Sequence, residues 1–551
     1  MEPLKNATKW GDRESAHIKV TEPLKKFVFQ HLDMDPDTLP KKYPQKKTLD
    51  AILGDSHLSA TFQSELTQLI DKTQITTDPW TRITNSLGQG YVESLRSRFS
   101  DIPAVVELVV FPHSHEEVVK VVQLANKHKV PLSTVAGATS VTLGIEPSLG
   151  IIAVNLTQMN KIIDVNPEAQ YITVESGILG PDLEAQLKTY GLTLGHFPQS
   201  FEYSTLGGWA ATRGAGQNST LYGKIEDMVM GMKFVTGLGE TLITRKAPAR
   251  ATGPDINHIL LGSEGTFGII TEMTLRVWKT PRKTRLSAFF FKSFEEGLLA
   301  YKEILQNGYR PAVMRISDSE ETYHNIVAQA LMRDTPKMPF SYRMLLGLLE
   351  KKGYKDGTRS MGVLSFEGDP ALVALTFKQA KKSFNRYKGV YIGSRPAKSW
   401  YKRRYELPFV RDPLIDHGIL IETFETSTTW DNIMILYRVT RKILKPECPI
   451  LWTHGSHFYP NGANLYFTLV APQKEKDEFT QYYRIRKKVL DTFQAYGGTL
   501  SHHHGIGRSF ISNYLAEIGD EGLKTLRSIK NALDPNKIMN PGIFGLDSKL
   551  S

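Results

Sequence analysis

The sequence predicts an α+β protein with more than one domain, and three observations support this fold class. The chain has 551 residues, more than one ordinary hydrophobic core accommodates. From residue 101, short β-branched runs alternate with helical patterns, which is typical of an α/β domain. From residue 281, longer strand-like runs alternate with long helices, which favours a separate α+β domain. We therefore expect four parts, at residues 1–100, 101–280, 281–500 and 501–551.

The first hundred residues predict a helical N-terminal extension. They are polar and rich in lysine, and TFQSELTQLIDKT (61–73) places apolar residues at helical spacing. We expect this extension to pack on the outside of the protein.

The α/β domain at 101–280 begins with a β-α-β unit. AVVELVVF (104–111) is β-branched and apolar, as expected of a buried strand. The helix HSHEEVVKVVQLANKHK (113–129) follows, with Ser114 as its N-cap and Glu117 completing a capping box. Three further strands and one helix are predicted at VPLSTVAG (130–137), GIIAVNL (150–156), YITVESG (171–177) and PDLEAQLKTYG (181–191).

The α+β domain at 281–500 is predicted from long strands and amphipathic helices. Strands are expected at LSAFFF (286–291) and ANLYFTLV (463–470), and helices at 293–308 and 476–498. The Pro/Asn/Gly-rich segment LDPNKIMNPG (533–542) is expected to wrap back onto the α/β domain.

Composition restricts the possible partners. The net charge is +11, which indicates either a solvated basic surface or attraction to phosphorylated substrates or an anionic membrane. The chain contains no zinc-finger spacing, no RRM-type motif and no long Lys/Arg run, so no nucleic-acid partner is expected. No window resembles a membrane span or a secretory signal, and Cys448 is the only cysteine, so a reducing compartment is expected.

Three glycine-rich stretches in the α/β domain predict nucleotide binding. They are TVAGATSVTLG (134–144), FPQSFEYSTLGGWAATRGAGQNSTLYG (197–223) and LLGSEGTFGIITE (260–272). Glycine lets backbone N–H groups approach phosphate oxygens closely. Any one stretch could be an ordinary turn, but three together favour a dinucleotide pyrophosphate. Neither a Rossmann fingerprint nor a Walker loop is present.

The run His502-His503-His504 in SHHHGIG (501–507) has three possible roles. It could bind a metal, transfer protons beside a substrate or cofactor, or form a turn. Adjacent histidines point in different directions and do not easily ligate one ion, whereas zinc ligands usually come from separated positions. The sequence therefore favours proton transfer, and no metal site is predicted.

These motifs resemble the vanillyl-alcohol-oxidase-type flavoproteins over about residues 100–545. The resemblance rests on the order of the three glycine-rich stretches and on LDPNKIMNPG. It implies that residues 101–280 bind FAD between two subdomains and that residues 281–500 form a cap domain. The stretches at 198–229 and 252–272, with FETSTTWD (424–431) and SHHHGIG, are most similar to the alkyldihydroxyacetonephosphate synthase family. That similarity implies a non-redox exchange, in which the acyl chain of acyl-dihydroxyacetone phosphate is replaced by a long-chain fatty alcohol to form an ether lipid.

The resemblance also implies which residues bind and react. Tyr466 and His502–His504 would be catalytic, and Arg315 and Arg411 would bind the substrate phosphate, although each arginine could instead form a structural ion pair. Nearby cations, including the histidines, could lower the pKa of Tyr466 for proton transfer. The FAD contacts would be Val135, Ala136, Gly137, Ala138, Thr139, Ser140, Val141, Pro198, Gln199, Ser200, Ser204, Ala211, Thr212, Arg213, Gly214, Glu264, Gly265, Thr266, Gly268 and Ile270.

Two departures from the family pattern are visible. The pyrophosphate loop reads AGATS where relatives commonly have GGGTS, and alanine at 136 and 138 suits the loop if φ stays negative. The closing MNPG (539–542) resembles the 2-hydroxy-acid dehydrogenase branch.

An FAD-dependent D-lactate or glycolate dehydrogenase is therefore the alternative function, and a flavin-binding protein without activity is a third. Those dehydrogenases place a separated histidine pair and an acidic residue around a metal. Here His454 and His457 form such a pair, with no carboxylate close in sequence.

The implied substrates suggest peripheral membrane contact, with docking through basic residues in 1–60 and in KSWYKRRYE (398–406). The family resemblance also implies a homodimer. The tail contains Ser548-Lys549-Leu550, a peroxisomal address that must be terminal, followed here by Ser551. A cytoplasmic or membrane-peripheral location in a bacterium and a peroxisomal one in a eukaryote both remain open, and secretion is not expected.

Overall fold

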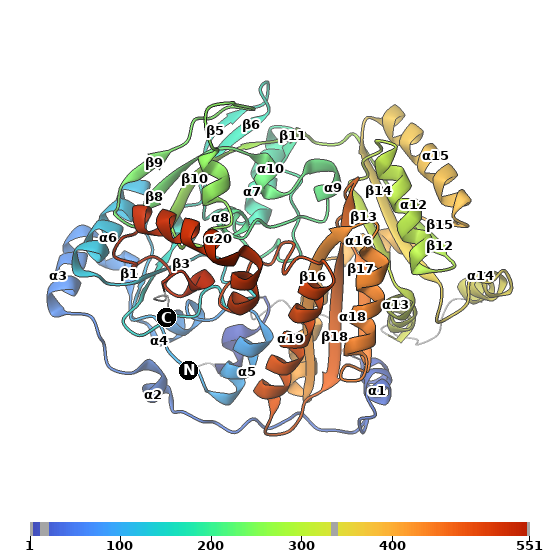
Figure 1. Cartoon of the computed structure of the whole chain (residues 1–551), viewed down its shortest axis with the longest axis horizontal. Helices are drawn as coiled ribbons and strands as arrows, with labels where there is room; N and C mark the ends of the chain where they lie inside the picture. The colour runs from blue at the N-terminus through green and yellow to red at the C-terminus, as the bar shows by residue number, and fades with distance from the viewer. Residues whose placement is uncertain (1–3, 12–20, 332–339, 548–551) are drawn as a thin grey trace.

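The fold consists of two halves, joined along one side by the N-terminal segment (Figure 1). The structure is a computed structural model and describes residues 4–11, 21–331 and 340–547. One half contains two small sheets and a two-stranded ribbon, and the other contains a single large sheet. The SKL tripeptide of the tail lies outside the described residues.

The first sheet of the smaller-sheet half carries the predicted β-α-β unit. Its strands run in the order β1 (Ile75–Thr76), β2 (Val109–Val110), β4 (Ile152–Asn155) and β3 (Leu132–Val135). Helix α6 (His115–His128) connects β2 to β3, and the Ser114 hydroxyl accepts a bond from the backbone N–H of Glu117 at 3.2 Å, as predicted for the N-cap. The Glu117 carboxylate accepts a bond from the His113 N–H at 2.7 Å. Only two residues of the predicted strand 104–111 pair with β4, although most of this run is buried.

The second sheet is antiparallel throughout. Its order is β5 (Ile162–Asn166), β6 (Tyr171–Glu175), β10 (Gly268–Arg276), β8 (Val229–Thr236) and β9 (Thr241–Ile243). A two-stranded ribbon pairs β7 (Leu192–Thr193) with β11 (Trp278–Lys279). The helices of this half are α7 (Gly180–Thr189), α8 (Leu206–Ala211), α9 (Ser219–Tyr222), α10 (Ile225–Met228) and α11 (Ile256–Leu260).

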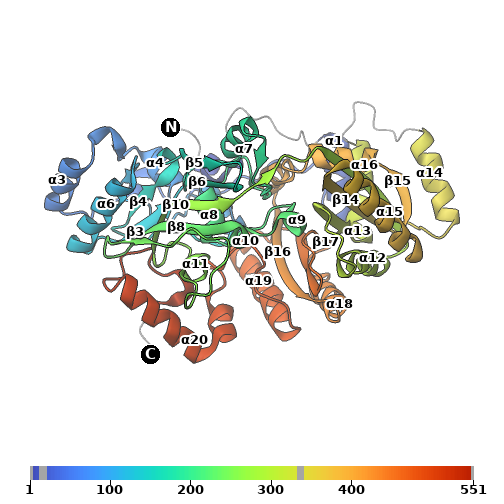
Figure 2. The same ribbon diagram turned by 90° about the horizontal axis from the view of Figure 1, so that it is seen from above.

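The large sheet has seven strands, and each strand runs antiparallel to its neighbours. Their order is β15 (Val390–Gly393), β12 (Lys283–Phe291), β14 (Ser360–Gly368), β13 (Val313–Ser317), β17 (Ile450–Gly455), β18 (Gly462–Pro472) and β16 (Ile419–Thr429). The hydrophobic core on one face is formed with α12 (Phe294–Gln306), α15 (Pro370–Arg386), α18 (Ile433–Leu444) and α19 (Glu478–Ala495). Figure 2 shows the large sheet and its helices from above.

Side chains alternate along these strands, so polar residues such as Arg315 and Tyr466 lie on the face of the large sheet that is not covered by these helices. In β18, Leu465 and Phe467 point into the core shared with the helices, whereas Tyr466 between them lines a cavity. In β13, Ile316 faces the core and Arg315 lines the same cavity. The two-residue period of a strand therefore brings Arg315 and Tyr466 to one face.

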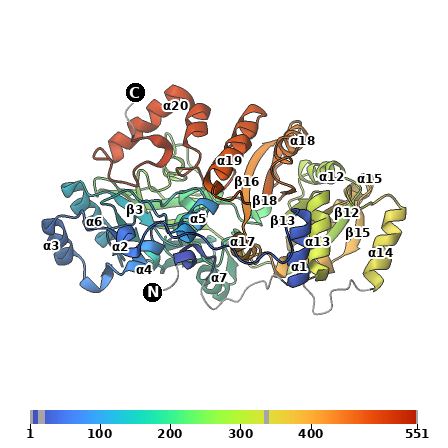
Figure 3. The same ribbon diagram turned by 90° about the horizontal axis from the view of Figure 1, so that it is seen from below.

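The N-terminal extension contacts both halves rather than lying on one. Helix α3 (Ala60–Leu69) packs on α6, while α1 (Glu22–His31) lies beside α13 (Ser319–Leu331) of the large-sheet half (Figure 3). Strand β1 also comes from this extension. The other helices of the extension are α2 (Leu49–Leu53), α4 (Pro79–Thr84) and α5 (Tyr91–Phe99), and those of the large-sheet half are α14 (Phe340–Lys351), α16 (Arg395–Lys402) and α17 (Arg411–Asp416).

The C-terminal segment returns to the first sheet, as predicted. Helix α20 (Ile511–Leu533) precedes it, and the chain then runs beside β3, where Leu132 N–H donates to the Ile538 carbonyl and Asn540 N–H donates to the Leu132 carbonyl, both at 2.7 Å. The buried Lys530 ammonium donates to Asp534 and to the carbonyls of Thr266 and Met539. This cation therefore ties the C-terminal segment to the third glycine-rich stretch.

Candidate active site

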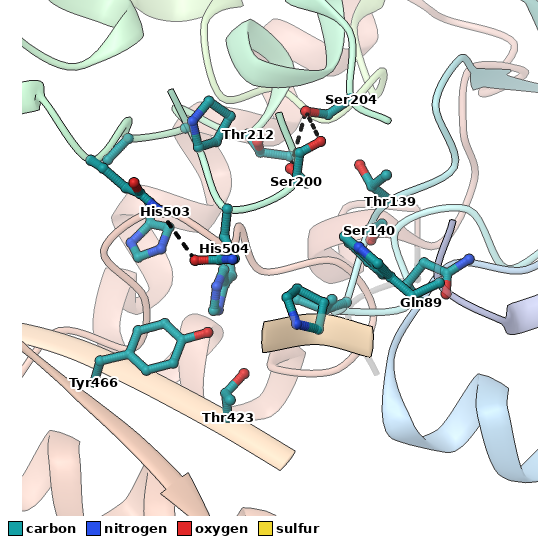
Figure 4. A pocket seen from close by; sticks show the side chains of 18 of the residues that line it. Gln89, Thr139, Ser140, Ser200, Ser204, Thr212, Thr423, Tyr466, His503 and His504 are labelled. Atoms are coloured by element: carbon teal, nitrogen blue, oxygen red, sulfur yellow. Dashed lines mark hydrogen bonds between the residues drawn. The ribbon is translucent and has the colours of Figure 1, made fainter. Parts of the chain in front are cut away.

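A cavity of about 570 Å³ lies between the two halves. Its walls come from the three glycine-rich stretches, from strands β13, β16, β17 and β18, and from helices α1 and α13. Figure 4 shows Tyr466, Thr423, His503 and His504 close together, with Thr139, Ser140 and Gln89 across the pocket. Apolar side chains line another part of the wall, namely Leu24, Phe27, Val28, Leu414, Ile421, Trp452 and Val470.

The cavity brings together most of the predicted FAD contacts. Those that line it are Val135, Ala136, Gly137, Ala138, Thr139, Ser140, Val141, Pro198, Gln199, Ser200, Ser204, Ala211, Thr212, Gly214, Glu264, Gly265, Gly268 and Ile270. Arg213 and Thr266 do not line it. The Arg213 guanidinium donates to the carbonyls of His258 and Leu261, and the Thr266 carbonyl accepts a bond from Lys530.

The walls formed by these stretches fit a dinucleotide cofactor. Gly137 lies so close to the backbone oxygen of Tyr203 that a Cβ there would overlap it. Among the described residues, the buried atoms Thr134 Oγ1, Ser176 Oγ and Asn540 Oδ1 belong to residues of the cavity wall and have no hydrogen-bond partner in the protein. Buried polar atoms usually have partners, and a nucleotide would supply them here.

Ala138 corrects one expectation about the pyrophosphate loop. Its φ is +49°, in the left-handed region, whereas a negative φ was expected for alanine at this position. An L-residue with a Cβ pays about 1–2 kcal/mol in that region. The loop therefore keeps a glycine-like conformation at position 138 without a glycine.

We expect Gly137→Ala to weaken FAD binding at least about tenfold, because the new methyl group displaces the loop from the Tyr203 backbone. Titration of the apoprotein with FAD, followed by flavin fluorescence, measures the affinity. Gly347→Ala on α14 is the matched control, since a Cβ there meets no atom within 4 Å. Equal FAD affinity in both variants would contradict this role of Gly137.

The histidine run forms a turn around a buried carboxylate. Glu425 in β16 accepts bonds from the backbone N–H groups of His502, His503 and His504 at 2.8–3.2 Å, and from the Ser501 hydroxyl at 2.8 Å. Burial raises the pKa of Glu425, but the neighbouring histidines, His503 first, outweigh it and hold the pKa well below its usual range. The carboxylate therefore stays ionised and fixes the turn.

A second buried carboxylate holds the rest of the turn from the other half. Glu264 accepts bonds from the N–H groups of Ile506 at 2.7 Å and Gly507 at 3.0 Å. Burial raises the pKa of Glu264 to about 7, against the lowering effect of these two bonds. The turn at 502–507 is thus held between Glu425 of the large-sheet half and Glu264 of the glycine-rich half.

The three histidine rings have different surroundings. His502 Nδ1 lies 2.9 Å from His503 Nδ1, and His503 Nδ1 lies 3.4 Å from Glu425 Oε2. The His504 ring meets Tyr466 edge-on, with centroids 5.6 Å apart. Burial lowers the pKa of His502 well below its usual range and that of His504 to about 4. These two rings are therefore neutral near pH 7, contrary to the expectation that the whole run holds positive charge.

Tyr466 stands among aromatic and imidazole rings. Its ring stacks on His454 with centroids 4.8 Å apart. Burial raises the pKa of Tyr466, and a hydrogen bond with Thr423 and the charge of Arg315 offset this only in part. The expectation that cations lower the pKa of this phenol is therefore wrong for the protein without its ligands. Tyr466 is a neutral phenol that can donate its proton.

Both predicted substrate arginines line the cavity, and both also form ion pairs. Arg315 Nη2 donates to Glu321 Oε1 at 2.6 Å and lies 3.0 Å from His454 Nδ1. Arg411 donates to Asp412 and to the backbone oxygens of Gln89 and Thr8. Its Nε is buried with no hydrogen-bond partner among the described residues. The two predicted roles of these arginines, ion pairing and binding of the substrate phosphate, are therefore compatible.

Two groups of side chains have ligand atoms spaced as metal ligands are. His457, His502 and His503 form one, and Glu425, His503 and His504 form the other, with ligand atoms within 4.8 Å of one another. Hydrogen bonds account for much of this geometry, because His457 bonds Ser219 at 2.8 Å and His502 bonds His503. That no metal binds here stays a prediction.

Several residues of the site were not predicted. Trp10, Leu24, Phe27 and Val28 come from the extension, which the sequence placed on the outside. Asn540 lines the cavity while its amide nitrogen donates to the Glu264 carbonyl at 2.7 Å. Sequence spacing gives no signal for these contacts. Glu425 lies within FETSTTWD, so the motif marked the segment but not the role.

Comparison with known proteins defines the class and then the family. A family model described as an FAD binding domain matches residues 106–245, and one described as the C-terminal domain of FAD linked oxidases matches residues 280–543. The protein is thus a two-domain FAD flavoprotein, which confirms the predicted fold class and cofactor.

Named relatives narrow this class further. The chain is 32% identical to alkyldihydroxyacetonephosphate synthase from Trypanosoma brucei brucei over 87% of this chain and 80% of that protein. It is 32% identical to the Dictyostelium discoideum synthase over 93% and 82%, respectively. A solved alkyldihydroxyacetonephosphate synthase superposes with a TM-score of 0.80 at 29% identity, covering 97% of this chain and 98% of that one. The chain belongs to the alkyldihydroxyacetonephosphate synthase family and is an FAD-dependent enzyme.

Proposed function

We propose that this enzyme exchanges the acyl chain of acyl-dihydroxyacetone phosphate for a long-chain fatty alcohol and so forms an ether bond. The observation that carries the proposal is a single cavity in which Tyr466, His503 and His504 lie near the predicted FAD loops. The same cavity offers arginines for a phosphate and an apolar wall for a hydrocarbon chain. Phosphate dianions are held well by guanidinium groups.

Different residues of the cavity bind the cofactor, bind the phosphate and transfer protons. FAD, when bound by the glycine-rich loops, supplies the ring at which the exchange proceeds without net oxidation or reduction. Arg411, through its free Nε, and Arg315 hold the phosphate. The Tyr466 phenol gives its proton to the leaving carboxylate, and the phenolate then takes the proton of the incoming alcohol. The apolar wall keeps water away from the reacting groups.

The alternative, a 2-hydroxy-acid dehydrogenase, has less support. A carboxylate does approach His454 in space, since Glu321 lies 3.2 Å from its Nδ1, but this carboxylate also pairs with Arg315. The metal-like groups within the described chain include His457 but not His454. His454 therefore belongs to no group of three such ligands among the described residues.

An anaerobic absorbance experiment distinguishes these functions. We expect the flavin spectrum to stay oxidised when palmitoyl-dihydroxyacetone phosphate and hexadecanol are converted to product. Bleaching by D-lactate or glycolate, with no ether product, would assign the dehydrogenase activity instead. A preparation that binds FAD but does neither would be the inactive flavin-binding protein.

The proposal includes peripheral contact with an anionic lipid surface through helix α14. Among the described residues, no helix is long and apolar enough to cross a bilayer. Phe340, Met344 and Leu348 form an exposed stripe at i, i+4 and i+8, and the exposed Arg343 and Lys351 lie on the same helix. Apolar burial and about 1 kcal/mol per cation near anionic lipid favour such docking. By contrast, Arg403 and Arg404, from the basic stretch expected to dock, line the cavity.

We expect Leu348→Gln to reduce co-sedimentation with phosphatidylserine-containing vesicles about tenfold, through the loss of buried apolar surface. Leu372→Gln on α15 is the control, because the two side chains are 54% and 55% exposed, respectively. Equal reduction of co-sedimentation in both variants, or binding that does not depend on salt or anionic lipid, would contradict docking through α14.

Assembly and location complete the proposal. We expect a homodimer, which analytical ultracentrifugation would detect as twice the chain mass of 62.0 kDa. We expect the enzyme to work at a membrane surface, in the cytoplasm of a bacterium or the peroxisome of a eukaryote, and fractionation of the source cells tests this.

A further inference from the structure

A continuous hydrogen-bonded chain joins His503 in the cavity wall to His502 and Tyr459 beside the cavity. His503 lines the cavity, whereas His502 and Tyr459 do not. His503 Nδ1 lies 2.9 Å from His502 Nδ1, and His502 Nε2 lies 2.6 Å from the Tyr459 hydroxyl. Tyr459 is partly exposed, and Pro460 next to it is exposed. The chain therefore runs from the cavity wall toward the surface.

We propose that His503, His502 and Tyr459 form a proton relay between the cavity and solvent. The inference rests in part on the proposed function, because alkyl exchange needs two proton transfers of opposite sense in a cavity filled by hydrocarbon chains. The acyl carboxylate leaves with a proton, and the incoming alcohol gives one up. A relay lets the site exchange protons with water by a route other than the one the chains occupy.

Each transfer along the relay conserves protons. In the outward direction, His503 gains a proton from the cavity at Nε2, its Nδ1–H bond breaks, and an N–H bond forms at His502 Nδ1. The His502 Nε2–H bond then breaks as Tyr459 Oη gains that proton, and Tyr459 passes its own proton to water. His503 and His502 are both left as the other tautomer, and the inward passage of a proton into the cavity restores both.

The surrounding contacts hold the relay in place. Glu425 binds the N–H groups of the turn, and the Lys224 ammonium donates to the His502 carbonyl at 2.9 Å. The His457 ring stacks on His502 with centroids 5.0 Å apart and bonds Ser219 through its Nδ1. The titratable or charged groups around the relay are Glu425, His457, Tyr466, His504, His196, Lys224, Glu226 and Asp227.

The protonation states of His502 and Tyr459 suit a relay. Burial lowers the pKa of His502, and burial raises the pKa of Tyr459. Each group therefore has one proton to give and one lone pair to receive another at neutral pH. A chain of two imidazoles and a phenol also explains why adjacent histidines occur here, since His503 lines the cavity while His502 bonds Tyr459.

Replacement of Tyr459 by phenylalanine tests the relay, because it keeps the ring and removes only the hydroxyl. The first measurement is solvent exchange of the imidazole N–H protons in FAD-bound enzyme labelled with ¹⁵N-histidine, with no substrate present. We expect Tyr459→Phe to slow exchange at His502 and His503 about tenfold. Tyr437→Phe is the control, since it removes a part-buried hydroxyl that bonds Asp318 instead.

The second measurement is turnover. We expect Tyr459→Phe to lower kcat about tenfold with unchanged KM, and added imidazole buffer to restore part of the rate. Wild-type exchange rates at both histidines in Tyr459→Phe would overturn the relay. A wild-type enzyme that makes no ether product would overturn the proposed function, whereas the exchange measurement would still decide the relay.

Discussion

Tyr466→Phe is expected to reduce kcat by a factor of about 10²–10⁴, the usual range for losing a positioned proton donor. The hydroxyl is the only group removed, and it lines the cavity beside His504, His454 and Thr423. Because the phenol has a raised pKa, it is protonated before the reaction and serves first as the donor. FAD binding should be unchanged, since the predicted pyrophosphate loop is on the other half.

Steady-state kinetics together with the flavin absorbance of the purified variant measure both effects. Tyr222→Phe is the matched control, because its hydroxyl bonds Glu367 outside the cavity at 3.0 Å. If Tyr466→Phe retained kcat within about twofold, well short of that range, the phenol would not be the proton donor and His504 would be the next candidate.

Glu425→Ala is expected to cost about 3–5 kcal/mol of unfolding free energy, as for the loss of one partner of a buried ion pair. The carboxylate accepts bonds from three backbone amides and Ser501 and faces His503. Without it, these buried donors lose their acceptor. The turn would also release His502 and His503, so kcat should fall even where the protein remains folded.

The pH dependence of this stabilisation has a definite sign. The pKa of Glu425 is lowered on folding, so the unfolded state binds more protons in acid. The contribution is complete above the ordinary carboxyl pKa of 4.5 and is lost as the pH falls through the lower folded value. The stability difference between wild type and Glu425→Gln should therefore shrink in acid.

The contribution of Glu264 to stability depends on pH with the opposite sign. Burial raises its pKa from 4.5 to about 7, so its ionisation costs stability, and this cost grows as the pH rises between those values. Urea unfolding of wild type, Glu425→Ala and Glu425→Gln at neutral and acid pH separates the contribution of Glu425 to the free energy of unfolding from that of Glu264. A Glu425→Ala protein as stable as wild type at neutral pH would show that the turn does not depend on Glu425.

Local sequence patterns predicted the parts of the site that depend on local geometry. The glycine-rich stretches predicted a nucleotide site, because glycine permits close backbone approach, and the structure brings the three stretches together in one cavity wall. Ser114 and Glu117 predicted the start of α6, because a cap needs only neighbouring residues. Strand periodicity also explains why Arg315 and Tyr466 share one face, once the order of β13, β17 and β18 is known.

Long-range contacts decided what the sequence did not predict. Glu425 lies 76–79 residues before the atoms it binds, and no spacing rule connects them. Burial, which is set by the whole fold, makes His502 and His504 neutral and raises the pKa of Tyr466. The extension was expected outside the core, yet α1 supplies Phe27 and Val28 to the cavity because it packs beside α13.

The most direct test of the proposed function uses hexadecanol labelled with ¹⁸O and palmitoyl-dihydroxyacetone phosphate with purified FAD-bound enzyme. We expect one ether product per palmitate released, with the label kept in the ether oxygen and the flavin oxidised at the end. This result follows if the bond between the dihydroxyacetone carbon and the acyl oxygen breaks and the alcohol oxygen replaces it. Palmitate release without labelled ether, or an ether oxygen without the label, would contradict the exchange.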